Sequence, residues 1–301
     1  MGGNVFNAAG SIKKEDIEPT LQEFYNELGR VFPKAKKYFS GIKPLGSTGK
    51  KPVSGDIDLA LAGESVIKID DWGLDREQVL SDFRAFKKRS RTATNKLLIK
   101  RAIITNIAKK IDSKSNKILT DVKGSASGTL FMAFPQIDSN GKELGKHVQI
   151  DVNVGDMDWL TFSYYSKSYK DNVKGLHRTQ LLVSLFVEKG YTFSHNYGVK
   201  NKATQKIEAK NPEQAVELLN KLYRTKLTKS SISDYFKVIA AIQQSLPKQE
   251  LQSVLDRYLR ILDNTKADVP ANLQSYWIKN KDRIGLTGKY LPDTSQLKNY
   301  V

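Results

Sequence analysis

The clearest hydrophobic pattern in the chain is a two-residue alternation, which is the period of a β-strand. Residues 56–61 (Asp-Ile-Asp-Leu-Ala-Leu) place two acidic side chains on one face and apolar side chains on the other. Residues 147–154 (His-Val-Gln-Ile-Asp-Val-Asn-Val) repeat the arrangement, with Asp151 on the polar face. Both segments are therefore predicted to be strands that pack on a core with one face and carry carboxylates on the other.

Further elements are predicted around these two strands. Residues 118–123 and 129–137 read as strands, and Asp138–Lys142 with its Asn-Gly pair is predicted to be a hairpin turn. Residues 63–72 are expected to be polar and partly extended, and Asp156–Trp159 to form a surface turn. Apolar residues at helical spacing predict helices over residues 14–30, 75–86, 93–111, 174–190, 212–223, 231–245, 248–263 and 271–283. The pattern predicts an α+β fold with a mainly helical C-terminal domain, divided into residues 1–160 and 161–301.

The two acids of the first strand suggest a metal site. Asp56 and Asp58 stand roughly 6.5–7 Å apart along the strand, and ionised carboxylates there are costly unless a positive group lies between them. Mg²⁺ suits this position because hard cations prefer oxygen ligands and keep positions free for water and phosphates. A lone Asp-x-Asp is also compatible with a plain turn followed by two exposed acids. The Gly-Ser pair upstream and the apolar run downstream favour metal.

That upstream pair, Gly46-Ser47, is typical of a phosphate-binding turn. Glycine lets the backbone approach a phosphate closely, and its N–H and the serine hydroxyl can donate to phosphate oxygens. Lys50 and Lys51 lie between this pair and the acids, and their charges suit a triphosphate.

The combined pattern Gly46-Ser47-x8-Asp56-x-Asp58 resembles the signature of the polymerase-beta superfamily of nucleotidyltransferases. That family uses a third carboxylate on a later strand, and Asp151 matches it. The resemblance covers approximately residues 38–160 and implies a polymerase-beta-like mixed sheet flanked by helices. The long separation of Asp58 and Asp151 implies a helical insertion at about residues 75–112. The opening Met1–Phe6, joined to this motif, resembles bacteriophage-encoded nucleotidyltransferases.

The resemblance also implies a reaction. Asp56, Asp58 and Asp151 would be both catalytic residues and ligands of two Mg²⁺ ions, with Mn²⁺ as a substitute. A nucleoside triphosphate such as ATP would give its nucleoside monophosphate to an acceptor hydroxyl and release pyrophosphate. In the superfamily a basic residue on the helix after the third acid contacts the triphosphate, and Lys174 and Arg178 are the candidates here.

Residues 162–170 interleave aromatic rings with lysines and hydroxyls, which suits base stacking combined with phosphate contacts. An aromatic patch that caps the core explains most of the segment equally simply. Ser163 and Tyr164 are the two residues that we assign to nucleotide binding.

The formal net charge is +17, and residues 83–111 contain ten Lys or Arg and no Asp or Glu. An excess of this size favours polyanionic partners. The basic side chains of the two helices there either form a solvated surface or contact nucleic acid. The candidates for nucleic-acid binding are Lys87, Lys88, Arg89, Arg91, Lys96, Lys100 and Arg101. We therefore expect a nucleic-acid 3′ end as acceptor, with RNA favoured over DNA.

The composition of the chain indicates the cellular compartment in which the protein works. The chain contains no cysteine, which excludes disulfides and thiolate zinc sites and is typical of cytosolic proteins. No apolar run has the length of a membrane span, and the N-terminus does not resemble a signal peptide. We expect a cytoplasmic protein, in the host cytoplasm if the chain is viral.

Other functions fit parts of the pattern. One alternative keeps nucleotidyl transfer and changes the acceptor to a protein, a small molecule or another nucleotide, as in signalling or toxin-like enzymes. A non-catalytic nucleic-acid-binding protein on a degenerate transferase fold is the alternative from a different class.

Overall fold

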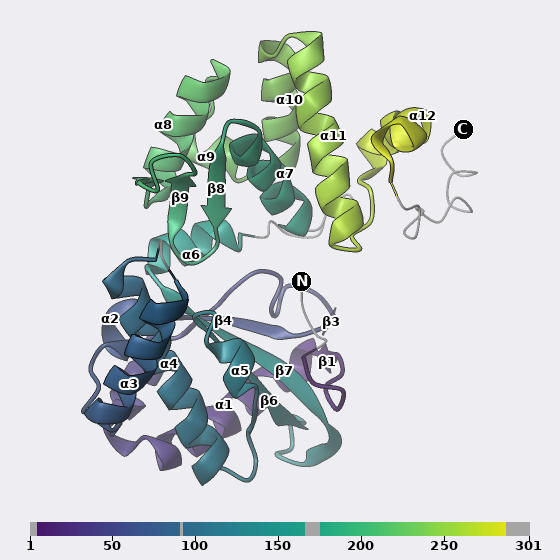
Figure 1. The fold of residues 1–301 in the computed structure, drawn as a ribbon. Helices are drawn as coiled ribbons and strands as arrows, with labels where there is room; N and C mark the ends of the chain where they lie inside the picture. Colours follow the sequence, from purple (N-terminus) through teal and green to yellow (C-terminus); the bar gives the residue numbers. More distant parts are fainter. Residues whose placement is uncertain (1–4, 91–92, 166–174, 287–301) are drawn as a thin grey trace. The chain divides into compact units, whose positions relative to one another are not determined.

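The computed structural model describes residues 5–90, 93–165 and 175–286. The chain folds as two compact units, residues 2–161 (the N-terminal unit) and residues 162–301 (the C-terminal unit) (Figure 1). None of the helices within these described ranges combines the length and the apolar content needed to cross a bilayer.

A five-stranded sheet forms the centre of the N-terminal unit. Its order is β2 (Lys43–Pro44), β4 (Ile57–Ala62), β7 (Glu143–Gly155), β6 (Thr129–Ile137) and β5 (Leu119–Thr120). Strands β4 and β7 run parallel, and the other neighbours are antiparallel. The sheet is therefore mixed, and the predicted α+β class is confirmed.

The same unit contains several helices. They are α1 (Lys14–Val31), α2 (Gly63–Val66), α3 (Arg76–Arg89), α4 (Asn95–Lys114), α5 (Val122–Ser125) and the 3₁₀-helix η1 (Pro33–Gly41). Two short strands, β1 (Ile12–Lys13) and β3 (Val53–Ser54), pair with each other. Helix α6 (Met157–Ser163) contains the boundary between the units.

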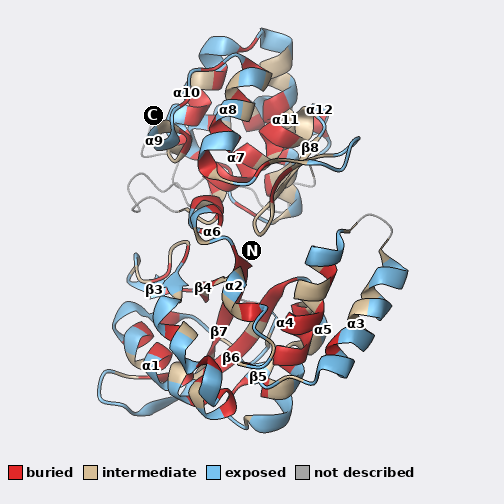
Figure 2. Cartoon of the chain, turned by 90° about the vertical axis from the view of Figure 1, so that its left-hand side faces the viewer, coloured by how far each residue is buried: buried red, intermediate tan, exposed pale blue. Residues whose placement is uncertain are grey.

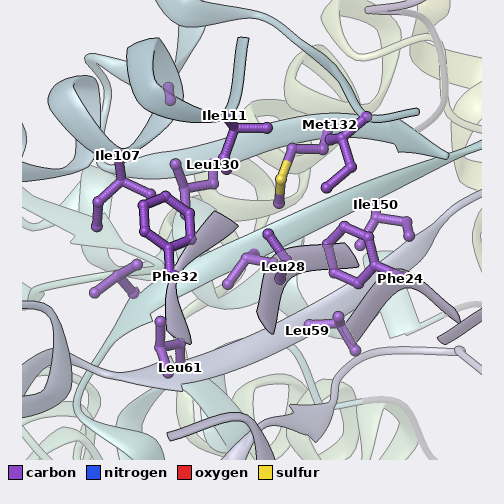
Figure 3. Packing of buried hydrophobic residues seen from close by; sticks show 14 of the residues in the cluster. Phe24, Leu28, Phe32, Leu59, Leu61, Ile107, Ile111, Leu130, Met132 and Ile150 are labelled. Atoms are coloured by element: carbon purple, nitrogen blue, oxygen red, sulfur yellow. The ribbon is translucent and has the colours of Figure 1, made fainter. Parts of the chain in front are cut away.

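The core of the N-terminal unit lies between one face of the sheet and the helices α1 and α4 (Figure 3). Phe24 of α1 is fully buried, and its ring meets Phe134 of β6 edge-on with centroids 5.6 Å apart. The apolar residues of β7 that alternate with Asp151 belong to the same core. The alternation predicted from sequence therefore leaves the acidic side chains on the opposite face.

The C-terminal unit is mainly helical, as predicted. Its helices are α7 (Gly175–Glu188), α8 (Pro212–Tyr223), α9 (Lys229–Ile232), α10 (Tyr235–Ser245), α11 (Lys248–Asn264), η2 (Ala271–Leu273) and α12 (Gln274–Ile284). A three-stranded antiparallel sheet of β8 (Tyr191–Ser194), β9 (Gly198–Asn201) and β10 (Ile207–Ala209) accompanies them.

The predicted helix 231–245 is divided into α9 and α10, because the Asp234 carboxylate caps a new helix at Tyr235. Three local predictions in the N-terminal unit were also wrong. Residues 63–66 form helix α2 where extended chain was expected. The predicted strand 118–123 is shortened to β5, because the Asp121 carboxylate accepts the Gly124 N–H and begins α5. The predicted turn 156–159 is the start of α6, where Asp156 accepts the N–H of Trp159 at 2.9 Å. In the last two cases a side-chain cap begins a helix where a strand or a turn was predicted.

Candidate active site

The pairing of β4 with β7 brings the predicted acids together. Asp58 lies directly opposite Asp151 in the parallel register, and Asp56 comes immediately before β4. One carboxylate oxygen from each of the three residues lies within 4.8 Å of the others. Residues 93 positions apart in the sequence thus form one cluster of oxygen ligands, a donor set that suits a divalent cation such as Mg²⁺.

The cluster is desolvated, and its charges oppose one another. Burial, with the Asp56 and Asp151 carboxylates beside it, raises the pKa of Asp58 well above its usual range. Burial also raises the pKa of Asp151 to about 7, and raises the pKa of Asp56, which Lys51 partly offsets. The site therefore holds negative charge at a cost that a bound cation would remove, which is the electrostatic fit expected of a metal site.

Amide side chains on the polar face of β7 hold two of the three acids, Asp151 and Asp58, in place. Gln149 donates to Oδ1 of Asp151 at 2.9 Å. Asn153 bonds to the Asp58 carboxylate and accepts the Thr129 hydroxyl at 3.0 Å. Because Gln149 and Asn153 are 1% exposed, these bonds hold the carboxylates in defined rotamers.

The predicted Gly46-Ser47 turn lies beside the start of β4. Gly46 has φ +60°, a left-handed conformation that glycine adopts without strain. The N–H of Leu45 donates to the Asp58 carbonyl at 2.8 Å, and the Asp58 N–H donates to Oγ1 of Thr48 at 3.0 Å. The turn is therefore attached to the backbone of one of the three acids.

The two lysines of this turn region differ in their surroundings. The backbone N–H of Lys50 donates to the Ser47 carbonyl at 3.0 Å, which closes the turn, and its side chain is exposed. Lys51 lies close enough to Asp56 for its charge to lower the pKa of that carboxyl. Lys51 therefore lies near the acidic cluster, and Lys50 belongs to the Gly46-Ser47 turn.

The predicted basic residues of α3 and α4 fall into two groups. Lys87, Lys88, Arg89 and Lys96 are exposed. Lys100 instead turns inward and donates to the Val154 carbonyl of β7, and burial lowers its pKa to about 8. Arg101 is half-buried, and Arg91 lies outside the described residues.

The remaining candidates belong to the C-terminal unit. Ser163 is buried and donates to the His195 carbonyl at 2.9 Å, and the Tyr164 ring lies 4.8 Å from the His195 ring. Arg178 is 3% exposed and donates to the carbonyls of Phe162 and Ile232. Its Nη2 has no hydrogen-bond partner in the part of the chain that the structure describes. Lys174 lies outside the described residues.

Sequence reasoning assigned no role to Thr48, Thr129, Gln149 or Asn153. The strand alternation had placed Gln149 and Asn153 on the face of Asp151, which was a usable signal. The two threonines carry no comparable signal, because only the fold brings them against β4 and β7.

No model of a protein family matches the chain, and no curated protein matches it significantly. Function is therefore inferred from the carboxylate cluster and from the resemblance of its motif.

Proposed function

We propose that the chain is a metal-dependent nucleotidyltransferase with a polymerase-beta-like catalytic domain. The observation that carries this proposal is the cluster of Asp56, Asp58 and Asp151, which face one another within 4.8 Å on the buried polar face of a mixed sheet. A structural role alone leaves unexplained why three carboxylates share a desolvated position in which none of them forms an ion pair with a described side chain.

The three aspartates would hold two Mg²⁺ ions, or Mn²⁺, which in such sites lower the pKa of a hydroxyl and neutralise the charge of in-line transfer at phosphorus. In our proposal the Gly46 N–H, the Ser47 hydroxyl and Lys50 or Lys51 bind the β- and γ-phosphates of a nucleoside triphosphate. Catalysis then consists mainly of positioning and charge neutralisation.

We assign the acceptor hydroxyl to Oδ2 of Asp151, since Oδ1 already accepts from Gln149. In this proposal the Asp151 carboxylate orients the hydroxyl or takes up its proton. The acceptor oxygen would form a bond to the α-phosphorus as the bond from that phosphorus to the bridging oxygen breaks. Pyrophosphate leaves, and the proton of the hydroxyl passes to Asp151.

The acceptor favoured by the net charge of +17 is a nucleic-acid 3′ end. Transfer to a protein, a small molecule or another nucleotide uses the same three acids and differs only in what binds beside them. Ser163, Tyr164 and Arg178 remain proposed nucleotide contacts.

A Mg²⁺-dependent incorporation assay tests the proposal. Each labelled nucleoside triphosphate is offered with transfer RNA, single-stranded RNA, primed DNA or the protein alone. Asp58→Asn is the inactive variant. Asp112→Asn is its matched control. Asp112 is exposed and lies outside the cluster, so the same Asp-to-Asn change there leaves the three acids intact.

Label that moves onto one acceptor, and is lost only with Asp58→Asn, supports the transferase and identifies its substrate. Label found only on the protein or on free nucleotides retains the transferase and refutes the nucleic-acid acceptor. If no label moves with any nucleotide or metal, and nucleic acid binds equally well with and without Mg²⁺, the non-catalytic alternative is correct.

A further inference from the structure

Five exposed basic side chains gather where α3 ends and α4 begins. Four of them are on α3 and one is in the first turn of α4: Arg84, Lys87, Lys88, Arg89 and Lys96. We call this set the basic hairpin surface. Figure 2 shows that α3 is exposed along most of its length, whereas α4 is buried where it meets the sheet.

The packing of α3 explains why these charges point outward. Val79 is 1% exposed, and Phe83 and Phe86 pack on the core from the same side of the helix. Arg84 and Lys88 are four residues apart and therefore lie on one face of the helix. The rise between them is ~6 Å, which corresponds to about two phosphates along one strand of a duplex.

Acidic side chains do not neutralise this surface. Residues 83–111 contain no Asp or Glu, and the nearest acid on α3, Asp82, is engaged by Asn106 and Lys109 at 2.8 and 2.7 Å. No ion pair formed among the described residues includes any of the five basic side chains. Their charges are therefore available to an anionic partner in solution.

Lys100 attaches this surface to the strand that carries Asp151. It lies one helical turn beyond Lys96 on α4 and donates to the carbonyl of Val154. Val154 is three residues beyond Asp151 on β7, which is ~10 Å along the strand. The part of α4 that carries Lys96 is thus attached near one end of β7, and Lys100 contributes to the position of the basic hairpin surface and not to its exposed charge.

We propose that the basic hairpin surface binds the phosphate backbone of the nucleic-acid acceptor, an inference that rests on the proposed transferase function. Phe83 and Phe86 pack inward, and Leu80, one turn before Arg84, is a large apolar side chain of α3 that is 37% exposed. A single exposed leucine beside five charges is a small apolar area for insertion into a lipid bilayer, whereas the charges suit phosphates in solution.

Binding of a fluorescent single-stranded RNA, measured by anisotropy in EDTA with the Asp58→Asn protein, tests this surface without catalysis. Five phosphate contacts give a slope of log affinity against log salt of about −3.5, which is roughly a 100-fold loss of affinity between 50 and 200 mM salt. The variant Lys87→Gln/Lys88→Gln/Arg89→Gln is expected to reduce the slope by ~2 and the low-salt affinity by at least ~10-fold. The matched control removes three exposed lysines elsewhere in the N-terminal unit: Lys123→Gln/Lys142→Gln/Lys146→Gln.

Loss of RNA affinity in the hairpin variant but not in the control supports the surface. Equal losses in the two variants assign binding to net charge alone and overturn the inference. The inference is also overturned if the hairpin variant loses binding to vesicles of anionic lipid but keeps its affinity for RNA.

The same variants separate this inference from the proposed function. If RNA binds through the surface and no label is ever transferred, the surface stands and the transferase fails. If transfer to RNA occurs and is unchanged in the hairpin variant, the transferase stands and the surface fails.

Discussion

Replacing Asp151 with asparagine is expected to stabilise the protein when no metal is present. The substitution keeps the shape of the side chain and an oxygen that accepts the hydrogen bond of Gln149. It removes a charge that is 6% exposed and lies beside Asp56 and Asp58. The folded chain thus loses an unfavourable ionisation and retains its packing.

The size of the effect follows from the pKa of Asp151, which burial raises from 3.8 to about 7. A group whose pKa rises on folding binds its proton more tightly in the folded chain. Well below pH ~4 the carboxyl is protonated in both states and the free energy of unfolding is unaffected. As the pH rises, ionisation of Asp151 lowers the free energy of unfolding, and the full loss is reached above pH ~7. This loss is at most ~4 kcal/mol at pH 8 and ~2 kcal/mol at pH 5.

Thermal unfolding in EDTA at pH 5 and pH 8 measures this difference. For a unit of about 160 residues, each kcal/mol changes the melting temperature by ~2–4 °C, so Asp151→Asn is expected to melt several degrees higher at pH 8. Mg²⁺ should raise the melting temperature of the unsubstituted protein at pH 8 through its preferential binding to the folded state, and should do so far less for the variant.

Asp112→Asn provides the control, because Asp112 is exposed and lies outside the cluster. It should change neither the melting temperature nor the response to Mg²⁺. The electrostatic account of the site is wrong if Asp151→Asn melts at or below the temperature of the unsubstituted protein at pH 8, or if both respond equally to Mg²⁺.

Substitutions at three further residues test the side chains that support the site and the core. Thr48→Val leaves the buried N–H of Asp58 without its acceptor and should cost ~1–3 kcal/mol in urea unfolding, whereas Thr48→Ser, which retains the hydroxyl, should cost less. Gln149→Leu frees the Asp151 carboxylate and should weaken Mn²⁺ binding ~10–100-fold by calorimetry; unchanged affinity would show that Gln149 does not position this ligand. Phe24→Ala removes a fully buried ring and should destabilise the N-terminal unit by ~3–5 kcal/mol, and a loss below ~1 kcal/mol would contradict the packing described above.

Much of the local structure could be predicted because it depends on neighbours in the sequence. The alternation around Asp151 predicts which residues of β7 face the core, and the Asn-Gly pair predicts the hairpin between β6 and β7. Helices α1 and α8 have nearly the predicted bounds, since their apolar residues recur at helical spacing. The short helices α2 and α5 were missed because they are too brief to show a period.

Charge patterns were less informative about position. Helical periodicity placed Lys96 and Lys100 together on a basic surface, yet one is exposed and the other donates to a carbonyl of β7. Arg178 was predicted to contact phosphate, and two carbonyls of its own unit occupy most of its guanidinium. A long basic side chain can reach several environments, and its sequence neighbours do not select among them.

The sequence by itself determined that Asp56 and Asp58 share one face of a strand and that Asp151 lies on the polar face of another. Only the tertiary structure decided that these strands are parallel neighbours, in a register that sets Asp58 opposite Asp151. The physical reason is that strand pairing is a contact between segments far apart in the chain. Its register is set by the whole set of side chains that must be buried together with α1 and α4, and no local pattern contains that information.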